Sequence, residues 1–147
     1  LVRFKKGKIT NIFSSYIKAD KEISKEAKKV NQISKLKLLT APKEEKVMEQ
    51  VVEFLLNTLS GEIPLVAHNG LTFDILFLTK ALDRYGYPYK IQLVDTFKES
   101  KEYIDSSQGY KLVNLCDCLG IAIKNAHDAE CDAIACGELL NNIIKKI

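Results

Sequence analysis

Acidic and imidazole side chains stand beside two predicted helix starts. Asp74 follows His68-Asn69-Gly70 at the beginning of one helix, and Asp132 lies in the early turns of another, behind a loop that carries His127. Carboxylates bind hard divalent cations, and a neutral histidine can accept a proton from water near neutral pH. These residue types fit hydrolysis of a phosphodiester, which needs a deprotonated water and neutralisation of developing phosphate charge.

Each group also has an ordinary structural explanation. An acid in the first turn of a helix interacts favourably with the helix dipole, by about 0.3–1 kcal/mol, which would account for Asp74. His127 would then be a solvated loop residue and Asp132 a surface acid, since such spacing also arises by chance. Taken singly, neither group decides between the two explanations.

Strand and helix signals alternate along the chain. The predicted strands are an antiparallel hairpin, Leu1–Lys5 with Ile9–Ile17, followed by Ile63–Ala67 and Ile91–Val94. The predicted helices are Lys25–Gln32 with Ser24 as N-cap, a segment from Thr40 to Gly61, Thr72–Arg84, Leu112–Leu119 and Ala129–Ile144. Strands that come first and then alternate with helices indicate a mixed α/β sheet flanked by helices.

The strand before Asp74 should deliver that residue to a binding edge. Open α/β sheets bind ligands at the carboxyl ends of their strands. We therefore expect Asp74 to point toward the end of the preceding strand, with Phe73 anchoring the start of the helix.

Size and composition favour one globular domain over residues 1–147. The chain has 147 residues, 46% hydrophobic and 28% charged, and a net charge of +3, which permits nucleic-acid binding but argues for it weakly. Without a long apolar run there is no predicted membrane span, and four cysteines without a framework favour reduced thiols in a cytoplasmic protein. The chain also opens inside a strand-like run at Leu1, from which we expect that it lacks an upstream segment.

Two motifs resemble those of one enzyme family. His68, Asn69, Phe73, Asp74, Phe77 and Leu78 match the second motif of the DEDDh 3′→5′ exonucleases, which include the proofreading epsilon subunit of bacterial DNA polymerase III. Asn125-Ala126-His127, followed by Ala129 and Asp132, resembles the third motif, H-x-x-x-x-D. A sister group has tyrosine four residues before the last aspartate, where this chain has Asp128. Val94-Asp95-Thr96 and Leu112–Ile121 resemble intervening segments, so the resemblance covers essentially the whole chain.

The resemblance implies a fold, cofactors and residue roles. The fold would be an RNase H-like mixed sheet flanked by helices, and the cofactors two Mg²⁺ or Mn²⁺ ions. Asp74 and Asp132 would be metal ligands, His127 the general base and Asn69 a substrate-binding residue.

The family's first motif, D-x-E on the first strand, has no counterpart in the expected place. The tripeptide Asp20-Lys21-Glu22 lies in a polar stretch after the hairpin, where the family has an ordinary loop. The fold is therefore expected to lack its first strand, and two metals are expected only with the missing motif. The chain by itself should be inactive, and a partner chain, such as a second copy, could cover the open sheet edge.

Two functions from different classes follow. The first is a 3′→5′ exonuclease acting on single-stranded 3′ ends, with DNA favoured over RNA, together with a DNA polymerase subunit as a partner. The alternative is a non-catalytic nucleic-acid or polymerase-binding module of the same fold.

Three other constellations favour structural explanations. Zinc would suit Cys116, Cys118, His127, Cys131 and Cys136 by residue type, yet two cysteines spaced i, i+2 on a helix diverge by roughly 200°. The lysine-rich segment Lys18–Lys37 is best explained as a solvated helix face, with phosphate contact as the alternative. Tyr85, Tyr87 and Tyr89 could stack on bases, although packing over the adjacent helix end is favoured.

Overall fold

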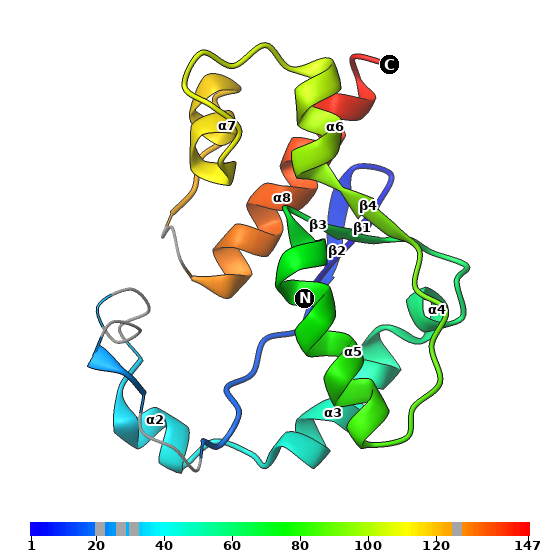
Figure 1. The fold of residues 1–147 in the computed structure, drawn as a ribbon, viewed down its shortest axis with the longest axis vertical. Helices are drawn as coiled ribbons and strands as arrows, with labels where there is room; N and C mark the ends of the chain where they lie inside the picture. Colours follow the sequence, from blue (N-terminus) through cyan, green and yellow to red (C-terminus); the bar gives the residue numbers. More distant parts are fainter. Residues whose placement is uncertain (20–22, 26–28, 30–32, 125–127) are drawn as a thin grey trace.

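The computed structural model of the protein describes residues 1–19, 23–25, 29, 33–124 and 128–147 (Figure 1). His127 and the tripeptide Asp20-Lys21-Glu22 lie outside the described residues. So does most of the helix expected over Lys25–Gln32.

The chain begins with the predicted hairpin. β1 (Val2–Lys5) pairs antiparallel with β2 (Lys8–Ile12), and Lys6 and Gly7 between them both have positive φ, 52° and 73°. A two-residue loop with two positive φ values matches the right-handed twist of the strands that it joins. The second strand ends earlier than the Ile17 predicted from composition.

A parallel strand pair follows in the middle of the chain. β3 (Leu65–Ala67) lies beside β4 (Leu93–Asp95), with Ala67 opposite Asp95 in the register. The connection runs through the short 3₁₀ helix η1 (Gly70–Thr72) and α5 (Asp74–Arg84). Because parallel strands end at the same sheet edge, the residues after Ala67 and Asp95 are brought side by side.

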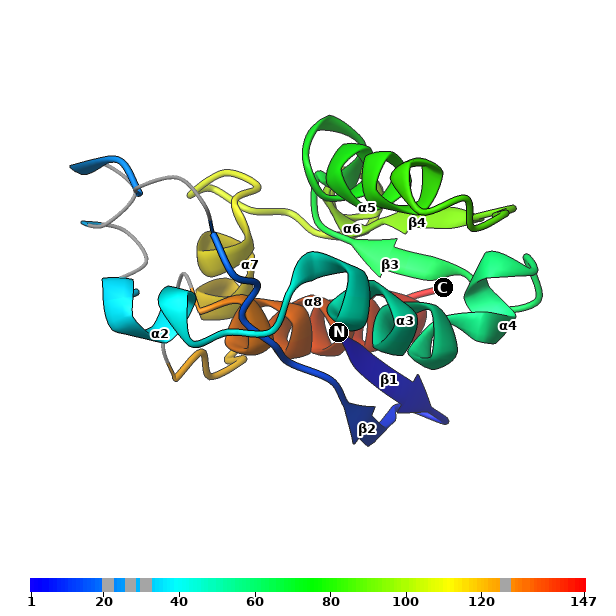
Figure 2. The same ribbon diagram turned by 90° about the horizontal axis from the view of Figure 1, so that it is seen from below.

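The predicted α/β class is confirmed, with antiparallel and parallel strands both present. In the described part of the chain the strands form two separate two-stranded sheets. The last helix, α8 (Ala129–Ile144), contacts both β1 and β3. Figure 2 shows α5 on one side of the β3 and β4 pair and α8 on the other. This helix is therefore the element that holds the two sheets together.

A first apolar core lies between three helices, α3 (Glu44–Phe54), α4 (Leu56–Leu59) and α5. The sequence predicted one helix up to Gly61, but the helix is interrupted at Leu55. Gly61, with a φ of 84°, follows the end of α4 as predicted. The buried residues of this core are Val47, Met48, Val51, Leu55, Leu59, Ala81 and Leu82.

A second apolar core lies between α6 (Thr96–Tyr103), α7 (Leu112–Cys118) and α8. Ile104, Leu115, Leu139 and Ile143 are its buried residues. The helices α7 and α8 agree with the predicted segments, whereas α6 and the short α2 (Lys35–Leu39) were not predicted.

Two of the three alternating tyrosines pack as favoured, whereas Tyr89 is 39% exposed. Tyr85 and Tyr87 contact the first core, and the Tyr85 hydroxyl donates a hydrogen bond to Glu44 at 3.2 Å. None of the helices in the described part of the chain combines the length and apolar character needed to cross a bilayer.

Candidate functional site

A tight turn, His68-Asn69-Gly70, leads from β3 toward Asp74. Asn69 is in the left-handed conformation, with a φ of 57°, which asparagine adopts more readily than most residues. A Cβ atom built on the next residue, Gly70, would meet the Cβ of Ala67 at 2.3 Å. Only glycine fits there, so the close approach of the turn to Ala67 requires Gly70.

Asp95 joins this turn to the end of β4. Its Oδ1 accepts hydrogen bonds from the backbone N–H of Asn69 at 2.8 Å and of Phe97 at 3.0 Å. The second bond is the N-cap of α6. Asp95 is 7% exposed, so this carboxylate is buried against the turn.

His68 adds a second connection between the same segments. Its Nε2 lies 2.9 Å from the carbonyl oxygen of Tyr110, and its Nδ1 lies 3.0 Å from Oγ1 of Thr96. Since a carbonyl can only accept, Nε2 carries the proton of this bond. In the neutral ring, Nδ1 and the carbonyl oxygen of Ala67, 3.2 Å from Oγ1, are the two acceptors within reach of the single Thr96 hydroxyl proton. Burial lowers the pKa of His68, against smaller raising effects from the Tyr110 hydrogen bond and from Asp95. The neutral ring is therefore favoured.

Asp74 begins α5 close to this turn. Its Oδ2 lies 3.8 Å from the position of a Cβ built on Gly70, which puts the carboxylate beside the end of β3. The pKa of Asp74 is raised, mainly by desolvation and further by the negative charge of Asp95, while a backbone hydrogen bond lowers it. A cation beside Asp74 would offset both raising effects.

Asp132 lies in the first turn of α8. Asp128 is the N-cap of this helix, and its Oδ1 accepts hydrogen bonds from the N–H groups of Glu130 and Cys131, both at 3.1 Å. Asp128 thus has a structural task at the position where the sister group has tyrosine. Asp132 interacts electrostatically with Cys116, and burial and this charge raise the thiol pKa to about 11.

Cys136 relates Asp74 to Asp132. Burial raises the pKa of the Cys136 thiol to about 11, and Asp95 and Asp74 contribute with their charges. Asp132 is four residues before Cys136 on α8, so both side chains lie on one face of the helix. Asp132 is thus one helical turn away on α8 from a thiol that lies within electrostatic range of Asp74.

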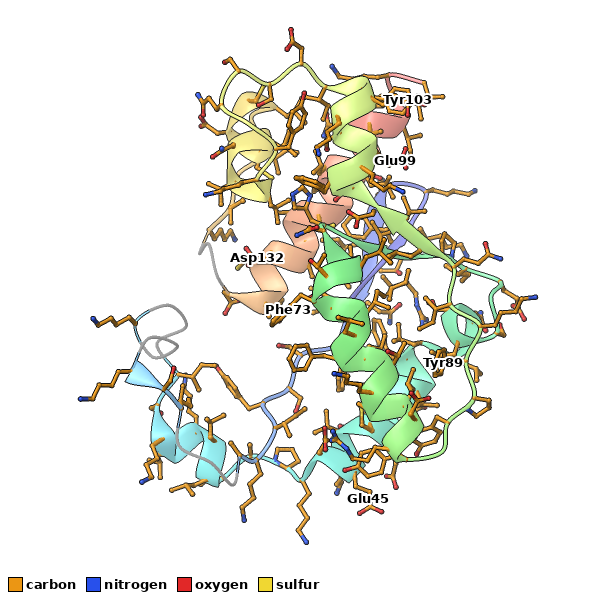
Figure 3. All side chains as sticks on the ribbon, in the orientation of Figure 1. Glu45, Phe73, Tyr89, Glu99, Tyr103 and Asp132 are labelled. Atoms are coloured by element: carbon orange, nitrogen blue, oxygen red, sulfur yellow. The ribbon has the colours of Figure 1, made fainter. Side chains whose placement is uncertain are left out.

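Phe73 does not anchor the start of α5, contrary to the prediction. It is 63% exposed and packs on Phe77, with ring centroids 4.7 Å apart. Figure 3 shows Phe73 at the start of α5 and Asp132 on α8, both labelled. The prediction was wrong because hydrophobic type alone does not tell which face of an amphipathic helix is buried.

The described residues do not assemble a set of metal ligands. Among them, no group of three or more His, Cys, Asp and Glu side chains is arranged to hold an ion. Asp74 and Asp132 are of the right chemical type for Mg²⁺ or Mn²⁺, yet two carboxylates do not make a two-metal site. All four cysteines are free thiols, with Cys116 and Cys136 buried and Cys118 exposed.

Two residues gain importance from the structure. Neither Asp95 nor His68 was predicted to have a role of its own, although Asp95 follows a predicted strand, where a helix N-cap is common. Their hydrogen bonds join residues far apart in the sequence, by 26 residues for Asp95 and 28 for His68, so no local sequence pattern indicates them.

Comparison with solved structures defines the fold. The chain is similar to exonuclease I, with a TM-score of 0.78 and 16% identity, covering 96% of this chain and 36% of that one. It is also similar to exonuclease X in complex with 5′ overhanging duplex DNA, with a TM-score of 0.66 and 20% identity, covering 98% and 79%. The fold is RNase H-like, as predicted.

Sequence comparison then gives the family. The RNase T family model, described as an exonuclease, matches residues 1–140, and the chain belongs to this exonuclease family. The DNA polymerase III epsilon subunit of Treponema pallidum is 30% identical over 146 residues, 97% of this chain and 65% of that protein. The 3′-5′ exonuclease DinG of Bacillus subtilis is 30% identical, covering 96% of this chain and 15% of that protein.

The chain is shorter than these relatives. It spans 10% of the PolC-type DNA polymerase III of Caldanaerobacter subterraneus, to which it is 27% identical over 146 residues. The motif resemblance to the epsilon subunit thus leads to the same family as the whole-chain comparison.

Proposed function

We propose that this chain is an exonuclease domain that acts at the 3′ ends of nucleic acids, with DNA as the favoured substrate. One observation carries the proposal. In a chain of the exonuclease family, Asp74 lies beside the end of β3 and within electrostatic range of Cys136 on α8. Asp132 is one helical turn before Cys136, in the first turn of the same helix. Both parallel strands end at this edge, where open α/β sheets bind ligands.

The two acids are proposed as ligands of Mg²⁺ or Mn²⁺. Such ions, when bound, lower the pKa of water and neutralise charge on the phosphate. The raised pKa of Asp74 supports this role. Desolvation and the Asp95 charge disfavour the ionised carboxylate, and a bound cation would stabilise it. Further ligands must complete the site, because the described residues hold no group of three.

His127 and Asn69 are proposed to act on the water and the substrate. His127 would take a proton from the attacking water, and it precedes Asp128, the N-cap that fixes the start of α8. Asn69 would contact the nucleotide, since its left-handed backbone belongs to the turn beside Asp74. A DNA polymerase subunit is the proposed partner, because two of the relatives are DNA polymerase III proteins.

The test compares the 147-residue chain with a version extended before Leu1 by a designed strand that carries Asp-x-Glu. We expect the extended protein, with Mg²⁺ or Mn²⁺, to shorten 5′-labelled single-stranded DNA from its 3′ end and to stop when EDTA is added. The unextended chain should bind divalent ions weakly and hydrolyse little.

The matched control carries Asn-x-Gln in the same strand, which adds the backbone without the charges. Activity should then stay at the level of the unextended chain. If the Asp-x-Glu protein left both DNA and RNA intact, the assignment would be wrong. The alternative, a binding module without catalysis, would gain support if that protein bound single-stranded DNA under the same conditions.

A further inference from the structure

Asp95 is a helix N-cap that also serves a second segment of the chain. An N-cap carboxylate usually accepts from the first turn of its own helix, as Asp128 does for α8. Oδ1 of Asp95 accepts from Phe97 in α6 and also from Asn69, which is 26 residues away. Asp95 is 7% exposed, so its carboxylate is largely shielded from solvent at these bonds.

The conformation of Asn69 is supported by a partner from another segment. Asparagine tolerates the left-handed region better than most residues with a Cβ, and the surroundings then select this conformation over others. The bond to Asp95 fixes the direction of the Asn69 N–H group. It therefore holds the conformation that carries the chain from β3 into η1 and then to Asp74.

The neighbours of Asn69 are held on both sides. His68 contacts Thr96 and Tyr110, and Gly70 packs against Ala67. Asp95 supplies the bond at the middle residue of the turn. Losing this acceptor would leave the Asn69 N–H without its partner in a partly buried place, which is costly.

We infer that Asp95 is a positioning residue, which sets the place of Asn69 and, through η1, of Asp74. It acts through the turn and does not touch substrate. Its effect on catalysis rests on the proposed function, whereas its effect on the turn does not.

Amide hydrogen exchange in the full chain tests the inference without any assay of activity. Asp95→Ala removes both bonds, and we expect the Asn69 amide to exchange at least tenfold faster relative to the amide of Leu82, a fully buried core residue. Asp95→Asn keeps an oxygen acceptor at Oδ1, so slow exchange of Asn69 should return.

Ser34→Ala is the matched control, because Ser34 caps α2 with a bond to the Lys37 N–H and has no role in the turn. It should leave the Asn69 amide unchanged. If Asp95→Ala prevents folding, Asp95→Ser replaces it, since serine caps helices well but has a shorter side chain. We then expect a slow Phe97 amide and a fast Asn69 amide.

The inference is overturned if Asn69 exchange relative to Leu82 is the same in the wild type and in the folded Asp95→Ala or Asp95→Ser variant. It is also overturned if the Asn69 amide exchanges as fast in Asp95→Asn as it does in Asp95→Ala. In the extended, active protein, kcat should fall in Asp95→Ala and recover in Asp95→Asn. If no version has nuclease activity, the proposed function fails while the exchange pattern still decides the role of Asp95.

Discussion

The ring of Phe4 in β1 lies directly on Gly137 of α8. A Cβ atom built on Gly137 would meet Cε2 of this ring at 2.1 Å and Cζ at 2.4 Å. The hairpin therefore approaches the helix more closely than any other residue at position 137 allows. Through this contact α8 joins the hairpin to β3, which the helix also contacts.

Gly137→Ala should destabilise the protein even though alanine favours helices. The added methyl forces the rigid Phe4 ring and β1 away from α8, and overpacking of this kind typically costs about 1–3 kcal/mol. Urea unfolding followed by circular dichroism measures the free energy of unfolding. Ile144→Ala, at an exposed position of the same helix, is the control and should change it by less than about 0.5 kcal/mol. Equal effects of the two variants would show that the hairpin does not rest on Gly137.

His68 should make stability fall in acid. Burial lowers its pKa in the folded state below the ordinary value of 6.5, so the unfolded chain binds this proton more readily. The stabilising contribution of neutral His68 is present above that value and is lost as the pH falls toward and through the folded pKa. Denaturation midpoints measured from pH 7.5 to 5 should decline less steeply in His68→Gln than in the wild type. An unchanged slope would mean that other groups cause the acid sensitivity.

His127→Ala and Asp132→Ala should differ in the active, extended protein. A general base contributes typically 10²–10⁴-fold to the chemical step, so His127→Ala should lower turnover by that order and leave divalent-ion affinity nearly intact. Asp132→Ala should impair both, because a metal ligand is needed before that step. Steady-state rates and calorimetric ion titrations separate these outcomes. Wild-type turnover in His127→Ala would reduce His127 to a loop residue.

The cysteines should react with alkylating reagents in a fixed order. Only the thiolate is a good nucleophile, and Cys116 and Cys136 are buried with pKa values of about 11. Cys118 is exposed and should be modified first at pH 7.5, with Cys116 and Cys136 protected until denaturant is added. Peptide mass spectrometry after timed iodoacetamide treatment gives the order. Early modification of Cys136 in the folded chain would contradict its burial on α8.

The elements around Asp74 and Asp132 were predictable because apolar periodicity marks them. Position 74 begins α5 within the expected Thr72–Arg84, and α8 covers Ala129–Ile144 as predicted. The long-range hydrogen bonds of Asp95 and His68 were not predictable. They depend on the register of β3 and β4, which brings their segments together and which the local sequence does not specify.

The helix α6 was missed for a physical reason. Its fully buried side chains are Thr96 and Ser100, four residues apart, so its inner face is polar. The Ser100 hydroxyl donates to the carbonyl of Thr96 at 2.6 Å, and the Thr96 hydroxyl lies 3.2 Å from the carbonyl of Ala67. Hydrophobic periodicity cannot detect a helix whose buried side chains are polar and form hydrogen bonds with backbone carbonyls. Asp95 as an N-cap was the signal that could have located it.

The apolar interior is divided into two cores, each built on its own set of helices. One half is built on α3, α4 and α5, and the other on α6, α7 and α8. Regions with separate cores commonly open as separate units, each with its own free energy. The turn at His68 and Asn69 fastens the first half to residues 95, 96 and 110 of the second. Transient opening of one half would thus shift Asp74, on α5, relative to Asp132, on α8, while the other half stays folded.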